Sequence, residues 1–180
     1  FRSFFLYFKM EFILGKLHDA VKAKTKTETH VVAVDFVKSL NKLHVYKYGD
    51  STKPKFTRTD ITKRNSRVYE YITSTLADSS IAKDMCVGIN PEYAEGSIQE
   101  VELGIFVFGM RERKKKQTLN LFKEFHGFVT CSVNGDTLKI DLICAKLRGL
   151  GTLLMKTIFG YATHYNYQRI ELEAATDLLA

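Results

Sequence analysis

The chain has no tryptophan, two prolines and three cysteines among its 180 residues. So few prolines argue against a proline-rich linker or a disordered chain. The cysteines, Cys86, Cys131 and Cys144, are odd in number and show none of the Cys-x-x-Cys or Cys/His spacings of a zinc site. The five histidines are also far apart in sequence. We therefore expect no bound metal, and reduced thiols in an intracellular protein of the cytoplasm or nucleus.

A long apolar run is missing as well. The most apolar stretch, FRSFFLYFKMEFILG at residues 1–15, is interrupted by Lys9 and Glu11 and is too short to cross a bilayer. No small-residue cleavage site follows it, so we expect neither a signal peptide nor a membrane span. Its apolar residues recur at helical spacing as far as Val21 and predict an amphipathic helix over residues 4–23. That helix would serve the core or a subunit contact in a homodimer.

The remaining composition is that of an ordinary globular domain, with 45% hydrophobic and 26% charged residues, so we expect one domain over residues 1–180. The net charge of +7 favours anionic partners without choosing between a cofactor, an acidic peptide, nucleic acid and a membrane surface. The densest basic run, RERKKK at residues 111–116, is interpreted as a solvated hairpin tip able to steer an acidic substrate. No aromatic residue is interleaved with it, so we do not expect a nucleic-acid partner.

The pattern along the chain changes from helical to extended after about residue 80. In the first, mainly helical part, residues 29–37 predict a strand, although residues 35–47 fit a helix capped by Asp35 equally well. Asp60 is expected to cap a second helix that ends near Leu76. The second part, residues 85–180, is expected to hold the sheet. Its predicted elements are strands over 97–110, 124–133 and 137–145, a helix over 152–165 and a final strand over 168–175.

The connections in this second part favour a mixed sheet. Asn134 and Gly135 tolerate positive φ and predict a tight hairpin between two antiparallel strands. The last strand–helix–strand unit is a crossover, which implies a parallel pair. The sequence therefore predicts an α/β domain whose sheet is mostly antiparallel and ends in one parallel pair.

The most informative stretch is TLKIDLICAKLRGLGTLLMKTIFGYA, residues 137–162. It passes from a strand through a basic, glycine-containing turn into a long apolar helix. The first turn of a helix has free backbone N–H groups and the positive end of the helix dipole. Glycines let a ligand approach those amides closely, so the junction predicts a phosphate site around Arg148, Gly149 and Gly151.

Two common phosphate loops do not fit this junction. A Walker A loop needs four residues between its glycines and then Gly-Lys-Ser/Thr, whereas Gly149 and Gly151 are separated by one residue and no lysine precedes Thr152. A dinucleotide fingerprint needs Gly-x-Gly-x-x-Gly, and Leu154 stands at the third glycine position.

A third loop fits better. The segment LICAKLRGLGTLLM resembles the acetyl-CoA-binding segment of the Gcn5-related N-acetyltransferase (GNAT) family, whose loop reads Arg/Gln-x-x-Gly-x-Gly/Ala. Arg148 and Gly151 match in register, and a glycine is common at the position of Gly149. Leu153 departs from the Gly/Ala of the last position. The hairpin before the loop and the strand after the helix follow the family's order, so the resemblance covers about residues 85–180.

The resemblance implies a GNAT-like fold, with helices flanking the sheet and acetyl-CoA in a gap where the two parallel strands splay. Backbone groups of Ile143, Cys144 and Ala145 would pair with the pantetheine arm. Amides of the following turn would wrap the pyrophosphate, namely those of Arg148, Gly149, Leu150, Gly151, Thr152 and Leu153.

The implied activity is direct transfer of acetyl from the CoA thioester to an amine, on a protein or a small molecule. Glu102 and Asp141 are the candidate general bases, and Glu102 is placed ahead because it is closest to the centre of its predicted strand. In this family more structure follows the final strand, so we expect this chain to be truncated at its C-terminal end. The alternative is a GNAT-fold structural or interaction protein that no longer acetylates and uses its basic surface for binding; Leu153 and the lack of a clear base motivate it.

Overall fold

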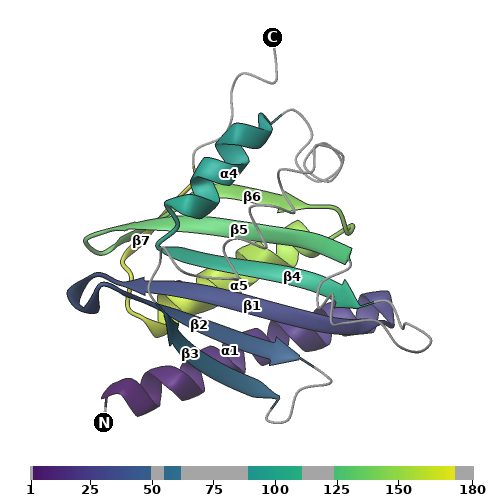
Figure 1. The fold of residues 1–180 in the computed structure, drawn as a ribbon, viewed down its shortest axis with the longest axis horizontal. Coiled ribbons are helices and arrows are strands. Elements are labelled where there is room, and N and C mark those ends of the chain that lie inside the picture. Colours follow the sequence, from purple (N-terminus) through teal and green to yellow (C-terminus); the bar gives the residue numbers. More distant parts are fainter. Residues whose placement is uncertain (1, 50–54, 62–88, 111–123, 173–180) are drawn as a thin grey trace.

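Seven strands form one sheet in the order β3-β2-β1-β4-β5-β6-β7 (Figure 1). The structure is a computed structural model and describes residues 2–49, 55–61, 89–110 and 124–172. Neighbouring strands are antiparallel except β6 and β7, which are parallel. The strands are β1 (Glu28–Val37), β2 (Lys42–Gly49), β3 (Phe56–Ile61), β4 (Leu103–Met110), β5 (Glu124–Asn134), β6 (Thr137–Ala145) and β7 (Arg169–Leu172).

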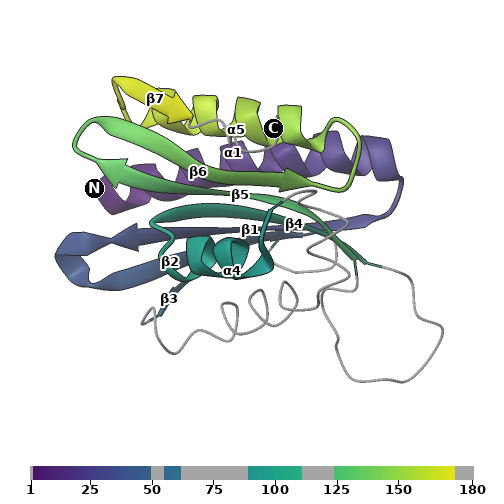
Figure 2. The same ribbon diagram turned by 90° about the horizontal axis from the view of Figure 1, so that it is seen from above.

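Helices cover both faces of the sheet. The described helices are α1 (Arg2–Thr25), α4 (Pro91–Gln99) and α5 (Leu150–His164), with a 3-10 turn at Lys38–Leu40. The helices α1 and α5 lie side by side on one face, and α4 lies on the other (Figure 2). The predicted class is confirmed at this level: an α/β protein with a mixed, mostly antiparallel sheet flanked by helices.

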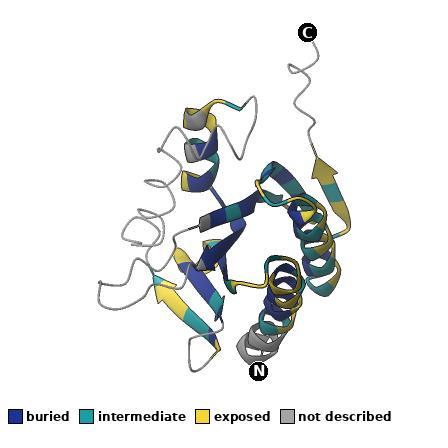
Figure 3. Ribbon diagram, turned by 90° about the vertical axis from the view of Figure 1, so that its right-hand side faces the viewer, coloured by how far each residue is buried: buried dark blue, intermediate teal, exposed yellow. Residues whose placement is uncertain are grey.

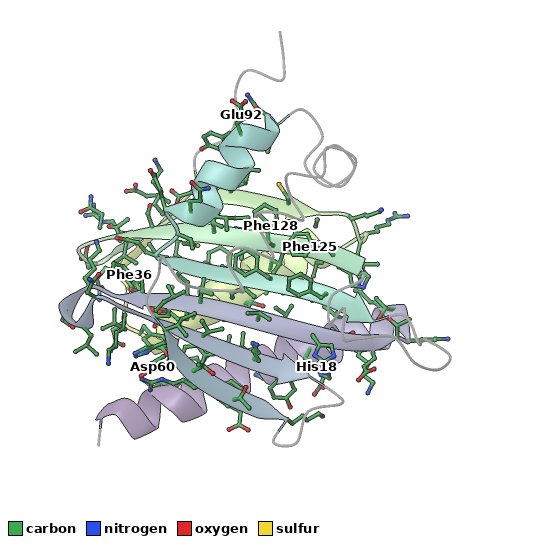
Figure 4. All side chains as sticks on the ribbon, in the orientation of Figure 1. His18, Phe36, Asp60, Glu92, Phe125 and Phe128 are labelled. Carbon is green, nitrogen blue, oxygen red and sulfur yellow. The ribbon has the colours of Figure 1, made fainter. Side chains whose placement is uncertain are left out.

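Each face of the sheet has its own hydrophobic core. Under α1 and α5, residues such as Leu14, Val21, Leu154 and Ile158 are buried against the sheet. On the α4 side the core is aromatic, and its phenylalanines are buried and stack on one another (Figure 4); they are Phe106, Phe108, Phe125 and Phe128. The two cores share the strands between them, so the sheet is packed on both sides.

The buried side chains of β6 switch from one face of the sheet to the other partway along the strand. Thr130 pairs with Leu142 while Cys131 pairs with Ile140, so Asp141 is an extra residue with no partner on β5. Such a bulge shifts the alternation of side chains by one. As a result Leu138 and Ile140 belong to the core under α1 and α5, whereas Leu142 and Cys144 belong to the aromatic core.

Several local predictions are confirmed. The N-terminal helix is α1, and the strand over residues 29–37 is β1. The hairpin forms at Gly135, whose φ is +61°, and the glycine turn leads into α5. The final strand is β7, of which residues 169–172 are described.

Other predictions are wrong. Asp35 lies inside β1 and caps no helix, because the chain turns at Lys38–Leu40 and returns as β2. Asp60 lies in β3, so residues 28–61 of the supposedly helical part supply three strands. Residues 97–99 belong to α4, because Asn90 caps that helix by accepting the Glu92 N–H at 2.9 Å and Pro91 fits its first turn. The rest of the helix expected after Asp60 and the basic run 111–116 lie outside the described residues.

Candidate functional site

The strand β6 extends beyond its neighbour β7. The parallel pairing joins Thr137–Ile140 to Arg169–Leu172 and then stops, while β6 continues to Ala145. On that side residues 141–145 pair with no strand among the described ones (Figure 1). An unpaired strand edge presents N–H and C=O groups to an extended ligand.

The turn that follows is fixed by its own hydrogen bonds. The amides of Lys146 and Leu147 donate to the His126 carbonyl at 2.8 and 3.4 Å, which ties the turn to β5. The Leu150 amide donates to the Leu147 carbonyl at 3.0 Å, and Gly149 stands at the helix N-cap with φ +81°. These hydrogen bonds therefore hold the turn in one conformation where it enters α5.

Four amides of this turn donate to no protein acceptor among the described residues: those of Arg148, Gly149, Gly151 and Thr152. They lie at the N-terminus of a 15-residue helix, where the helix dipole favours an anion. Leu150 and Leu153, which were expected to join them, use their amides on the carbonyls of Leu147 and Gly149. The set of amides left open to an anion is therefore smaller than the resemblance implies.

A lysine from the other end of the chain completes this site. Lys24, in the last turn of α1, has its Nζ 2.9 Å from the point where a Cβ on Gly149 would stand. Arg148 and Lys146 are exposed on the same turn. Sequence reasoning missed Lys24, and the one signal for it was the basic last turn of α1. A glycine at position 149 is thus favoured for two reasons: its φ is positive, and a Cβ there would crowd the Lys24 ammonium group.

Gly151 is not required by packing. Among the described residues, and leaving out the helix's own backbone, no heavy atom lies within 4 Å of the point where its Cβ would stand. A glycine there leaves room for a ligand to reach the backbone.

The predicted cofactor strand residues lie on the part of β6 that extends beyond its pairing with β7. Ile143, Cys144 and Ala145 pair on their other side with Val129, Phe128 and Gly127 of β5. The expectation of reduced thiols is wrong for Cys144, which is buried and disulfide-bonded. A pairing of that kind depends on distances between strands and loops, which the spacing of cysteines does not show. Cys131 is free and buried, and burial raises the pKa of its thiol.

Asp141 lies where β6 and β7 separate, because the last paired residue of β6 is Ile140. Its Oδ1 accepts a hydrogen bond from Ser132 Oγ at 2.9 Å. Burial raises the pKa of Asp141, and the charges of Glu102 and Glu100 add to that effect, while Ser132 and Lys139 oppose it. Perturbed carboxyl groups beside a gap are candidates for proton transfer.

Glu102 is placed differently. It stands just before β4, its Oε1 lies 2.6 Å from Lys38 Nζ, and its Oε2 accepts the Val133 N–H. Only 18% of its side chain is exposed. Both carboxylate oxygens are therefore engaged in holding β4, β5 and the 3-10 turn together.

A second polar cluster lies on β1 to β3, away from this edge. Burial raises the pKa of Asp35 to about 6, and the charge of Arg58 opposes the shift. Arg58 Nε donates to Asp60 Oδ1 at 2.9 Å, and His44 pairs with Asp35 across the two strands. This cluster could not be predicted from the sequence, because its members meet only through strand pairing.

Among the described residues no group of three or more His, Cys, Asp or Glu side chains is arranged to hold a metal ion. Within the same residues no helix is both long and apolar enough to cross a membrane. Comparisons of the chain with protein-family models, with curated protein sequences and with solved structures each found no match. The case for a function therefore rests on the residues of the β6 edge and the α5 turn themselves.

Proposed function

We propose that this chain binds acetyl-CoA along β6 and the first turn of α5 and transfers the acetyl group to an amine. One observation carries the proposal: beyond Ile140 the edge of β6 pairs with no described strand, and it leads directly into four amides without an acceptor among the described residues and into a cluster of cations. A ligand with an extended arm that ends in a pyrophosphate is complementary to a strand edge followed by an anion site. The GNAT-like loop at Arg148–Leu153 is consistent with the same ligand.

The dimensions agree with such a ligand. From Asp141 to Ala145 the strand spans about 13 Å at about 3.3 Å per residue, a length suited to a pantetheine arm lying alongside it. The pyrophosphate then reaches the amides of Gly149 and Gly151. Lys24, beside Gly149, and the exposed Arg148 supply positive charge to it.

The thioester of a ligand in this position would lie beside Asp141. We assign the general base to Asp141, and not to Glu102, because both oxygens of Glu102 are already engaged. Asp141 takes a proton from the amine, whose nitrogen attacks the thioester carbonyl carbon. The C–S bond then breaks, and the CoA thiolate leaves and takes up a proton. The bulge leaves backbone groups at Asp141 outside the β5 ladder, where a donor can stabilise the oxyanion.

The decisive experiment is calorimetric titration of acetyl-CoA into the wild-type chain, Lys24→Glu and Arg148→Glu, with Lys42→Glu as a charge-matched control. Lys42 is exposed at the start of β2, on a different part of the sheet. We expect binding by the wild type and the control, and at least tenfold weaker binding by the other two. Equal affinities in all four proteins would remove the α5 turn from the cofactor site.

Transfer is tested separately, with labelled acetyl-CoA and a panel of protein N-termini, lysine peptides and polyamines. The proposed enzyme transfers label to one of these classes and Asp141→Asn does not. The alternative, a scaffold without transferase activity, gains support from the open basic face between α1 and α5. Binding of acetyl-CoA with no transfer to any amine of the panel would favour that alternative. Because acetyl-CoA is used inside cells, the enzyme proposal also implies an intracellular location, whereas the disulfide at Cys144 is more typical of an oxidising compartment.

A further inference from the structure

A groove runs between α1 and α5 on the side of the two helices that faces away from the sheet. Figure 3 views both helices nearly end-on, with buried residues toward the sheet and exposed residues outside. The groove encloses about 270 Å³. Its lining is mostly apolar and consists of Phe12, Ile13, Lys16, Leu17, Ala20, Leu153, Lys156, Thr157, Gly160 and His164.

Small residues create this groove. Ala20 on α1 and Gly160 on α5 lie in its floor, and no heavy atom is within 4 Å of the point where a Cβ on Gly160 would stand. One end is clamped by Lys9, whose Nζ donates to the His164 carbonyl at 2.8 Å. The hollow is thus part of the folded helix pair, because both helices are packed on the core.

Two aromatic side chains are exposed on the same layer. Phe12 in the groove is 53% exposed and Phe159 on α5 is 48% exposed. Lys16 Nζ lies 4.2 Å from the centre of the Phe12 ring, and His164 meets that ring edge-on. Exposed aromatic residues beside a hollow are typical of the centre of a protein interface.

The charged residues that line the groove are all basic. Lys16 and Lys156 line it, and Lys9 and Lys24 lie toward its two ends. No aspartate or glutamate is among the lining residues, and residues 150–164 contain none at all. An occupant that carries acidic groups on either side of an apolar stripe would be complementary to this surface.

We propose that the α1–α5 groove binds an acidic amphipathic helix of a partner protein. That helix would place apolar side chains at i, i+3 or i+4, and i+7 over the floor, and its carboxylates beside Lys16 and Lys156. A second copy of this chain is a poor occupant, because a two-fold contact would bring the same lysines face to face. A lipid surface is also a poor one, because the apolar floor is concave. The groove does not include the β6 edge, although Leu153 and Lys24 belong to or adjoin both surfaces, so peptide binding is measured without acetyl-CoA.

The test is a display library of 20-residue helical peptides selected on the immobilised wild-type chain. Enriched peptides are then titrated by fluorescence anisotropy against the wild type, Gly160→Met and the double variant Lys16→Glu/Lys156→Glu. We expect acidic sequences with the i, i+3/4, i+7 apolar spacing to be enriched. Both variants should bind them at least tenfold more weakly, and the double variant should lose most of the salt dependence.

Two controls separate the groove from general effects. Gly96→Met changes a helix glycine in α4 that also has no atom within 4 Å of its Cβ position, and Lys42→Glu changes an exposed lysine elsewhere. Both should bind within twofold of the wild type, and circular dichroism should show all variants folded. Enrichment of neutral or basic peptides, or of peptides indifferent to Gly160→Met, would overturn the proposal. So would a wild-type dimer in sedimentation velocity that Gly160→Met dissociates, or binding to phosphatidylserine vesicles without any peptide binding.

Discussion

Replacing Gly151 with alanine should make the ligand-free protein more stable and the ligand-bound protein less so. Gly151 lies in the first turn of α5 with no heavy atom near its Cβ position, so a methyl group meets no protein atom. Glycine inside a helix costs roughly 0.5–1 kcal/mol relative to alanine. Without ligand, Gly151→Ala should therefore raise the midpoint of thermal unfolding by about 1–4 °C for a chain of this size.

With acetyl-CoA the order of the two proteins should reverse. The methyl group takes space that the pyrophosphate needs to approach the amides, and we expect affinity to fall about tenfold. At a ligand concentration one hundred times the wild-type dissociation constant, the wild type gains about 2.7 kcal/mol and the variant about 1.4 kcal/mol. The loss of about 1.3 kcal/mol exceeds the gain of roughly 0.5–1 kcal/mol from the helix.

The assay is thermal unfolding of both proteins with and without acetyl-CoA, with Gly149→Ala as the counterpart. Gly149 has φ +81° and Lys24 Nζ at 2.9 Å from its Cβ position, so alanine there should cost about 1–2 kcal/mol even without ligand. If Gly151→Ala destabilised the ligand-free protein, the space above the turn would not be empty. If it bound acetyl-CoA as the wild type does, the ligand would not lie against this amide.

Three further predictions concern other residues. Asp141→Asn should abolish acetyl transfer without weakening acetyl-CoA binding. In the wild type, kcat/KM should rise with pH through a pKa above the usual range for aspartate, because burial raises the pKa of Asp141. A pH profile that stayed flat would show that Asp141 is not the base. Burial raises the pKa of Asp35 to about 6, so the folded state holds this proton more tightly than the unfolded state and wild-type stability falls as pH rises from about 4 to about 6. Asp35→Asn should therefore be more stable than the wild type at pH 7, by about 3 kcal/mol at most, and near equal at pH 4, and urea titrations that gave the same difference at both pH values would contradict this. Phe128→Ala should cost about 3–5 kcal/mol by urea unfolding, because the ring is fully buried among Phe106 and Phe125.

The elements that the sequence predicted well are those set by local chemistry. In α5 the apolar residues follow helical spacing from the glycine turn onward, and the Asn134-Gly135 pair allows one tight hairpin. Residues 35–47 fitted a helix or a strand, and the outcome depends on pairing of β1 with β4, which is distant in sequence. The prediction of a strand at residue 97 overlooked the cap at Asn90 and Pro91, although both residues are visible in the sequence.

The candidate site divides in the same way. The glycine turn around Gly149 and Gly151, where we propose the anion site, is contiguous in sequence, and the turn itself could be predicted from it. Lys24 reaches that turn only because α1 packs along α5. The carboxylate of Glu102 is bound by Lys38 and by the Val133 amide, which belong to two other elements of the fold. The bulge that leaves Asp141 unpaired has no signature in the alternation of TLKIDLICA, which looks regular from end to end.

That bulge has a consequence for how the folded protein opens. The first half of β6 is packed by the core under α1 and α5, and its second half by the aromatic core next to α4. Loosening one helical layer therefore uncovers only one half of the strand. In native-state hydrogen exchange, the amides near Ile140 should gain or lose protection together with α1 and α5, while those near Leu142 should follow α4. A single strand would thus report on two separately opening parts of the molecule.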